Sequence, residues 1–245
     1  LHLDTEEGFI PLSYIDIDTI TLDKVVLQSI QQRSHRSILD VFSAEDSIVI
    51  PNQRLAANDT VCTILSDHIT KTAKSAYSRS DIGYIVSRYG MYASSVSVDW
   101  IGALAQAIHE TGWFSSWWSQ PPRHNMAGIG VTGDMRTDPP QSGQWAYHEQ
   151  SKRWYRGFQF QTIDDGINHH IALLLIYAVH PDRMTDVQRD LIAQTYFAPF
   201  YRSHRYAGKA PRWIDLNGRW AVPGTEYGQR ITAIARRLLR FSALP

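Results

Sequence analysis

Hydrophobic side chains recur at helical spacing in six segments after residue 59. These segments are residues 60–76, 80–90, 99–112, 162–178, 185–196 and 231–239. Ser80 and Asp81 can cap the second segment, and Gly90 can end it. Thr162, with Asp165 three residues later, forms a capping-box pattern before the fourth segment. The pattern predicts a mostly helical protein.

Short stretches of alternating or continuous hydrophobic residues predict the strands. Two arms within Gln144–Gln161, joined around residues 150–152, indicate a β-hairpin. Ile15–Leu22 alternates like a strand, and Ser47–Pro51 is a short apolar run of the same kind. Residues 24–42 have helical spacing that a polar stretch interrupts. Together the elements predict an α+β fold in which helices dominate.

The first 77 residues differ from the rest, because they contain no pattern with recognisable chemistry. We expect residues 1–77 to form an N-terminal extension or a small α+β module of unknown role. Residues 78–245 are expected to form the main domain. Asp16 and Asp18 do not indicate a calcium loop, because the glycine and glutamate that an EF-hand needs are missing.

Composition narrows the class of protein. The 245 residues are 43% hydrophobic and carry a net charge of zero, which argues against a nucleic-acid binder that relies on basicity. Cys62 is alone, so no disulfide can form within the chain. No segment reaches the length of a membrane span. Because the chain begins at Leu1, we expect a mature or trimmed fragment whose sequence leaves export undecided.

Glu110 stands out by its position. Asp99 can cap the third predicted helix and Gly112 can end it, so Glu110 lies in the last turn. An ionised carboxylate is disfavoured at that end of a helix. The next eight residues supply four aromatic rings: Trp113, Phe114, Trp117 and Trp118.

If these rings bury Glu110, desolvation favours its protonated form, which a general acid in glycoside cleavage requires. The alternative is a surface glutamate beside an ordinary aromatic core. His109 and Glu110 begin like a zinc-protease HExxH motif, but Trp113 stands where the second histidine would be. A zinc site is therefore not expected here.

The stretch AQAIHETGWFSS (residues 105–116), followed by HNMAGIGVTG (residues 124–133), resembles the glucosaminidase family of bacterial cell-wall hydrolases. The matching residues are Ala105, Gln106, Ala107, Glu110, Thr111 and Gly112 in the first stretch, and Asn125, Gly128 and Ile129 in the second. The resemblance implies a lysozyme-like domain with a small β-hairpin lobe and a glycan groove. It also implies that Glu110 is the catalytic acid.

The resemblance implies further site residues. Glu149 on the predicted hairpin would be the second acid, with Asp134 and Asp138 as rivals and a plain surface glutamate as the alternative. Tyr227 could hydrogen-bond the substrate or the catalytic acid, or belong to the core. The residues expected to bind substrate are Trp113, Trp117, Asn125, Gly128, Ile129 and Trp220. Asn125 could instead anchor its loop, and Trp220 stands where the family more often has tyrosine.

The implied activity is hydrolysis of β-1,4 bonds in peptidoglycan by an endo-β-N-acetylglucosaminidase, secreted or associated with the cell wall. The implied partner is the glycan strand, and neither a metal nor an organic cofactor is expected. The alternatives are a wall-binding module without turnover, the same fold acting on other N-acetylated glycans, and a muramidase or lytic transglycosylase. An inverting, a retaining and a substrate-assisted mechanism all remain open.

Overall fold

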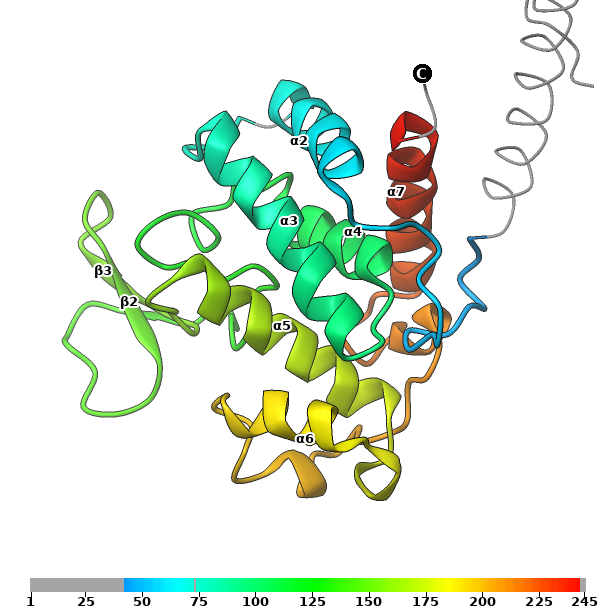
Figure 1. Cartoon of the computed structure of the whole chain (residues 1–245). Coiled ribbons are helices and arrows are strands. Elements are labelled where there is room, and N and C mark those ends of the chain that lie inside the picture. The colour runs from blue at the N-terminus through cyan, green and yellow to red at the C-terminus, as the bar shows by residue number, and fades with distance from the viewer. Residues whose placement is uncertain (1–41, 73, 243–245) are drawn as a thin grey trace, which may run out of the picture. The chain divides into compact units, whose positions relative to one another are not determined.

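The structure is a computed structural model, and it describes residues 42–72 and 74–242 (Figure 1). The predicted strand at Ile15–Leu22 lies outside the described residues, as does nearly all of the helix expected over residues 24–42. The chain divides into a unit of residues 1–40 and a unit of residues 41–245. The description below concerns the second unit.

Six α-helices account for most of the regular secondary structure in the described residues. They are α2 (Asp59–Thr72), α3 (Arg79–Ser95), α4 (Trp100–Thr111), α5 (Ile163–Ala178), α6 (Asp186–Ala193) and α7 (Tyr227–Ser242). Short 3₁₀ helices cover Pro181–Arg183, Tyr201–Ser203 and Trp213–Leu216. The predicted mostly helical α+β fold is confirmed, and it is consistent with a lysozyme-like architecture.

Helix α4 lies at the centre, with α3 and α7 packed against it (Figure 1). Every residue from Trp100 to Ile108 is buried. A Cβ on Gly102 would lie 2.1 Å from the Trp213 ring, and one on Gly228 of α7 would lie 2.2 Å from the Trp213 carbonyl oxygen. The two glycines therefore give Trp213 the space it occupies between α4 and α7.

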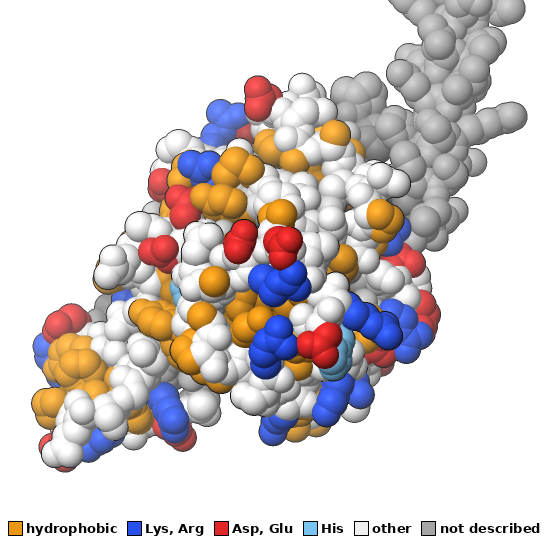
Figure 2. All heavy atoms as spheres, turned by 60° about the horizontal axis from the view of Figure 1, so that its bottom comes forward, with side chains coloured by type: hydrophobic (Ala, Val, Ile, Leu, Met, Phe, Trp, Pro, Cys, Tyr) orange, Lys and Arg blue, Asp and Glu red, His pale blue; other side chains and the backbone are white. Residues whose placement is uncertain are grey.

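The β part is a three-stranded antiparallel sheet of β1 (Met135–Arg136), β2 (Trp145–His148) and β3 (Arg153–Arg156), in the order β1-β3-β2. The predicted hairpin is thus confirmed, and β1 adds a strand to it. The sheet forms a lobe at the left of Figure 1. Figure 2 shows hydrophobic side chains gathered on the surface at the left of the view. Met135 of β1 and Tyr147 of β2 are exposed.

Three sequence predictions, two about the ends of one helix and one about a strand, are wrong. Helix α3 is capped by Ser78 rather than Ser80, and it continues through Gly90 to Ser95. Gly90 does not end the helix, because its role is packing: a Cβ there would lie 2.4 Å from the Ala57 Cβ. Ser47–Pro51 is not a regular strand, since this segment makes only isolated bridges, from Ser47 to Arg212 and from Val49 to Val98.

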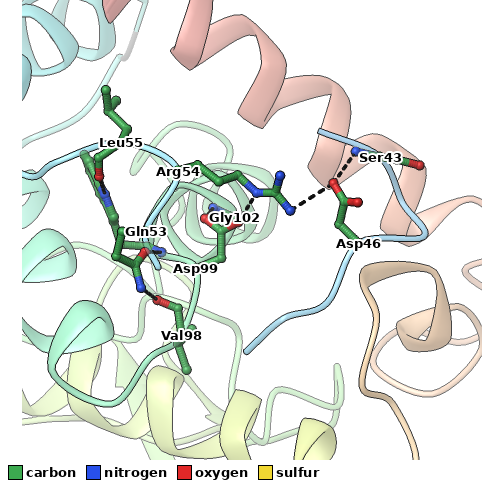
Figure 3. A network of polar contacts seen from close by, with 9 residues as sticks. Ser43, Asp46, Gln53, Arg54, Leu55, Val98, Asp99 and Gly102 are labelled. Carbon is green, nitrogen blue, oxygen red and sulfur yellow. Dashed lines mark hydrogen bonds and ion pairs between the residues drawn. The ribbon is translucent and has the colours of Figure 1, made fainter. Parts of the chain in front are cut away.

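The segment before α2 holds the start of α4 in place (Figure 3). The Arg54 guanidinium lies 2.7 Å from the buried Asp99 carboxylate and 3.0 Å from Asp46. Asp99 also accepts the Gly102 N–H and caps α4. Gln53 donates to the Val98 carbonyl and accepts the Trp100 N–H. The helix that carries Glu110 is therefore anchored at its N-terminus.

Residues 42–77, which the sequence analysis assigned to the N-terminal extension, pack in the same unit as the main-domain helices. Helix α2 contacts both α3 and α7. Phe42 is buried and its ring lies 6.4 Å from that of Trp213. None of the helices in the described part of the chain combines the length and apolar character needed to cross a bilayer.

Candidate active site

Glu110 lies in the last turn of α4, as predicted. Gly112 ends the helix in the left-handed conformation, with φ of +55°, and its N–H faces the carbonyl oxygens of Ile108 and His109. Both predicted caps, Asp99 and Gly112, are confirmed. The helix thus ends two residues after the carboxyl group and leaves it at the boundary of the core.

The backbone after Glu110 makes a left-handed turn in which Gly112, Trp113 and Phe114 have φ of +55°, +61° and +59°. Two of these are non-glycine residues, for which this conformation is unfavourable. The Thr111 hydroxyl supports the turn: it accepts the buried Phe114 N–H at 2.8 Å and donates to the Ala107 carbonyl at 2.6 Å. Thr111 therefore has a structural role immediately beside the candidate acid.

Burial and two hydrogen bonds determine the pKa of the Glu110 carboxyl group. Burial raises its pKa, while hydrogen bonds from the Tyr227 hydroxyl and from Trp220 oppose the increase. The net shift is upward, because desolvation of the charged form is the largest effect. A raised pKa keeps the group protonated to higher pH, which suits a general acid.

The rings that surround Glu110 are not those expected from the neighbouring sequence. Tyr227 and Trp220 come from the C-terminal part of the chain. The Trp113 ring instead lies near His68 of α2, with centroids 5.8 Å apart, and under the Arg237 guanidinium of α7. Trp113 thus packs between α2 and α7.

Trp117 joins the loop after α4 to the hairpin lobe. Its ring centroid lies 4.8 Å from that of His148 on β2 and 6.0 Å from that of Tyr155 on β3. The Arg123 guanidinium covers the ring at 3.9 Å. Trp117 is therefore a half-buried residue that packs against the lobe.

A cavity of about 420 Å³ opens beside Glu110. It is lined by His109, Glu110, Ala221, Pro223, Gly224, Thr225, Glu226, Tyr227 and Arg230. Glu226 and Arg230 face each other across 3.9 Å, and both are well exposed. The cavity therefore holds a second carboxylate, Glu226, in the wall that also contains Glu110.

The loop formed by residues 124–133 approaches Glu110 at Gly128. A Cβ on Gly128, which has φ of +60°, would lie 3.4 Å from Glu110 Oε2. Asn125 holds this loop: its amide N–H groups bond the carbonyls of Ile129 and Phe158, and its oxygen accepts the Ile129 N–H at 2.8 Å. Asn125 has no exposed surface and Ile129 is buried. The contacts of Asn125 are therefore those of a residue that anchors the loop.

Glu149 begins the turn between β2 and β3 rather than lying on the first strand. Its side chain is 79% exposed and pairs with Lys152 at 3.1 Å. It is not among the residues that line the cavity beside Glu110. Its rivals are exposed as well, and Asp134 pairs with Arg156 at 3.4 Å.

A chain of buried polar side chains continues inward from Glu110. Gln106 Nε2 donates to the Tyr227 hydroxyl at 2.8 Å. Gln106 Oε1 lies 3.0 Å from His170 Nε2, and His170 Nδ1 lies 2.8 Å from the Tyr89 hydroxyl. These contacts connect α4, α5, α3 and α7 around the candidate acid.

Sequence reasoning missed Gln106, His170 and Tyr89 as parts of the site. Two signals were available: Gln106 is polar within the apolar stripe of α4, and His170 lies within an apolar stretch of α5. His169 bonds the Asp165 carbonyl and the Tyr196 N–H, and the described residues contain no group of three or more potential metal ligands.

The fold and the site together define a class of protein. A mostly helical domain with a hairpin lobe carries a half-buried, hydrogen-bonded carboxyl group beside a cavity, as a lysozyme-like glycosidase does. The sequence profile of the Glucosaminidase family, described as mannosyl-glycoprotein endo-beta-N-acetylglucosaminidase, matches residues 87–240. The chain therefore belongs to the glucosaminidase family, and the predicted resemblance is confirmed.

Among solved structures, the catalytic domain of the autolysin Auto from Listeria monocytogenes is similar to this chain. The two share 15% sequence identity with a TM-score of 0.39, and the match covers 71% of this chain and 94% of the Listeria domain. In the comparison with curated protein sequences, nothing matches the chain.

Proposed function

We propose that this protein hydrolyses β-1,4 bonds of peptidoglycan as an endo-β-N-acetylglucosaminidase, with Glu110 as the general acid. The observation that carries the proposal is the Glu110 carboxyl group, which is half-buried, has a raised pKa and lines a cavity. Membership of the glucosaminidase family supports the reaction type. The protein would act outside the cell or on the wall, where its substrate lies.

In the proposed reaction, Glu110 gives its proton to the glycosidic oxygen as the bond to the anomeric carbon breaks. Tyr227 holds Oε1 of the carboxyl group, and we assign the proton that is transferred to Oε2. Gly128 leaves the space beside Glu110 Oε2 open to the substrate, because a Cβ at this position would lie 3.4 Å from that oxygen. Trp220, together with Trp117 of the loop after α4, would supply flat apolar faces for sugar rings.

Two carboxylates are candidates for the group that completes the reaction. Glu149 is the one that the family resemblance implies, and it would act from the hairpin turn. Glu226 is supported by its position in the same cavity wall as Glu110. A third route, in which the N-acetyl group of the substrate attacks, needs neither carboxylate.

The first test is wall lysis by Glu110→Gln, which preserves the shape of the side chain and removes its acid. We expect lysis to fall by at least about 10²-fold, the usual contribution of a general acid. Lysis at the wild-type rate by a folded Glu110→Gln protein would sink the proposal. Wall binding without lysis by the wild-type protein would favour a binding module.

The second test compares Glu149→Gln with Glu226→Gln in the same assay. The two side chains are similarly exposed, at 79% and 71%, so each serves as the control for the other. A large loss in only one of them identifies the second carboxylate. Wild-type lysis by both variants would support the substrate-assisted route.

A further inference from the structure

The hydrogen-bond chain behind Glu110 has one consistent direction. Gln106 gives its amide N–H to the Tyr227 oxygen, so its amide oxygen faces His170. An oxygen needs a donor, and therefore His170 carries its proton on Nε2. His170 Nδ1 is then an acceptor, and the Tyr89 hydroxyl donates to it. Every donor in the chain points toward Glu110.

We propose that Tyr89, His170 and Gln106 are positioning residues that hold the Tyr227 proton on Glu110 Oε1 and so assign the acidic proton to Oε2. The proposal rests on the proposed role of Glu110 as the acid. Tyr227 can give its own proton to Glu110 because its oxygen already receives the N–H of Gln106. Oε2, the other oxygen, faces Gly128.

If the hydrogen bonds of the chain ran in the opposite direction, Tyr227 would no longer donate to Glu110. If the Gln106 amide turned over, its oxygen would accept the Tyr227 proton and Glu110 Oε1 would lose a donor. Its N–H would then face His170, which would have to carry its proton on Nδ1, opposite the Tyr89 hydroxyl. Among the described residues, the Tyr89 hydroxyl hydrogen-bonds His170 alone, so in that arrangement its own buried proton would have no acceptor. Tyr89 therefore sets the direction from the far end.

The chain stays in one protonation state across the range in which Glu110 titrates. His170 and Tyr89 are fully buried. Burial lowers the pKa of His170 to about 3 and raises that of Tyr89 well above its ordinary value, so both stay neutral. The pKa of Tyr227 is also raised well above the ordinary value, mainly by burial. No member of the chain thus loses its proton before Glu110 does.

Other titratable groups face the two ends differently. Around Glu110, the cavity wall contributes His109 from α4 together with Glu226 and Arg230 from the C-terminal segment. Around His170, the contacts are Tyr89 of α3, Gln106 of α4 and the Trp220 ring at 5.8 Å. A change at Tyr89 or His170 therefore reaches Glu110 through neutral side chains and alters no charge beside it.

The test measures the titration of the Glu110 carboxyl group in the full chain by ¹³C NMR, together with the pH dependence of kcat/KM. In Tyr89→Phe and His170→Met, Tyr227 is no longer directed toward Glu110. We expect the Glu110 pKa and the basic limb of the profile to move upward by about 0.5–1 pH unit. The change should appear in kcat more than in KM, and it should be smaller than that of Tyr227→Phe.

Two variants act as controls. His169→Gln alters the neighbouring histidine of α5, which bonds the backbone of Asp165 and Tyr196 and does not belong to the chain. It should leave the Glu110 titration unchanged. His170→Gln keeps an amide donor for Gln106, so its titration should return toward that of the wild type.

A wild-type Glu110 titration in folded Tyr89→Phe and His170→Met would overturn the proposal. Tyr89→Phe removes a single oxygen, so it serves as the reference if His170→Met does not fold. The NMR titration needs no turnover. A pKa that moves in a protein without lytic activity would keep the positioning chain and reject the proposed function, and lysis with an unmoved pKa would do the reverse.

Discussion

At the scale of single residues, the environment of Glu110 suits a general acid but costs stability when the carboxyl group is ionised. Burial penalises its charged form, and the hydrogen bonds from Tyr227 and Trp220 compensate only in part. The folded state therefore binds the proton more tightly than the unfolded chain does. This contribution to stability is present at low pH and is lost as the pH rises through the raised pKa.

Glu110→Gln should therefore stabilise the protein at neutral pH. A neutral amide escapes the desolvation cost, and we expect a Tm increase of about 2–4 °C, equivalent to about 1 kcal/mol for a domain of this size. The gain should vanish at pH values below 4.5, where the wild-type group is protonated in both states. Scanning calorimetry of both proteins at several pH values measures this, and a pH-independent gain would contradict it.

Tyr227→Phe is expected to change the pH profile as well as the rate. The Tyr227 hydrogen bond lowers the Glu110 pKa, so its loss must raise that pKa and move the basic limb upward. We expect kcat to fall by about tenfold at the optimum, because the carboxyl group is no longer oriented. Steady-state kinetics between pH 4 and 9 test this, and an unmoved basic limb would count against the assignment.

Whether a site residue could be predicted depended on how far along the sequence its contact partners lie. Glu110 and Tyr227 were found because each lies in a recognisable motif. The contact of Gln106 with His170 spans 64 residues, and that of Tyr89 with His170 spans 81. Such pairs become visible only when helices pack, because local patterns do not determine which faces meet.

At the scale of elements, the left-handed turn after α4 depends on Thr111. In Thr111→Val the buried Phe114 N–H loses its acceptor, while size and branching are preserved. We expect a loss of about 1–3 kcal/mol in the free energy of unfolding. Thr111→Ser keeps the hydroxyl and should lose less. Urea denaturation compares the two, and equal losses would show that the hydroxyl does not support the turn.

The packing of Trp213 between α4 and α7 predicts opposite effects for two helical glycines. Gly102→Ala places a Cβ 2.1 Å from the Trp213 ring, and we expect it to destabilise the protein by about 1–3 kcal/mol. Gly83→Ala in α3 has its nearest neighbour at 3.8 Å and should stabilise by about 0.5–1 kcal/mol. Denaturant titration measures both, and matching signs would contradict the packing account.

Element boundaries followed local chemistry where caps were strong. Asp99, Gly112 and Thr162 cap as predicted, because their backbone partners lie within a few residues. Gly90 misled the prediction, since its small size serves the approach of Ala57 rather than a helix end. Ser47–Pro51 finds its partners around residues 98 and 212, so its isolated bridges could not be anticipated from its own sequence.

At the scale of the whole molecule, buried neutral histidines should make the protein sensitive to acid. The histidines with lowered pKa are His68, His109, His124, His169, His170 and His204. His170 is the strongest case, with a folded pKa of about 3 against an ordinary value of 6.5. Its contribution is fully present above pH 6.5 and is lost as the pH falls toward 3.

We therefore expect the free energy of unfolding to decrease as the pH falls below 6.5. His170→Gln removes the largest of these titrations, so its stability should fall less steeply with decreasing pH. Urea denaturation at intervals from pH 7.5 to 4 provides the comparison. Parallel curves for the two proteins would show that His170 does not contribute to acid sensitivity.

The overall fold class was predictable because helical periodicity and one hairpin account for most of the regular secondary structure of the described residues. The sequence was a poorer guide to which residues belong to the packed unit. Residues 42–77 carry no chemical motif, yet α2 contacts α3 and α7, and Arg54 pairs with the cap of α4. A family profile over residues 87–240 does not reveal such contacts, because they join segments on either side of its boundary.

Glu110 is proposed to protonate the leaving oxygen when the bond on the reducing side of N-acetylglucosamine is cleaved. Mass spectrometry of fragments released from purified peptidoglycan, after borohydride reduction, tests it most directly. The wild-type protein should release fragments that end in reduced N-acetylglucosamine, and Glu110→Gln should release almost none. Fragments ending in reduced muramic acid or in anhydro sugars would contradict the claim, as would release by Glu110→Gln at the wild-type level.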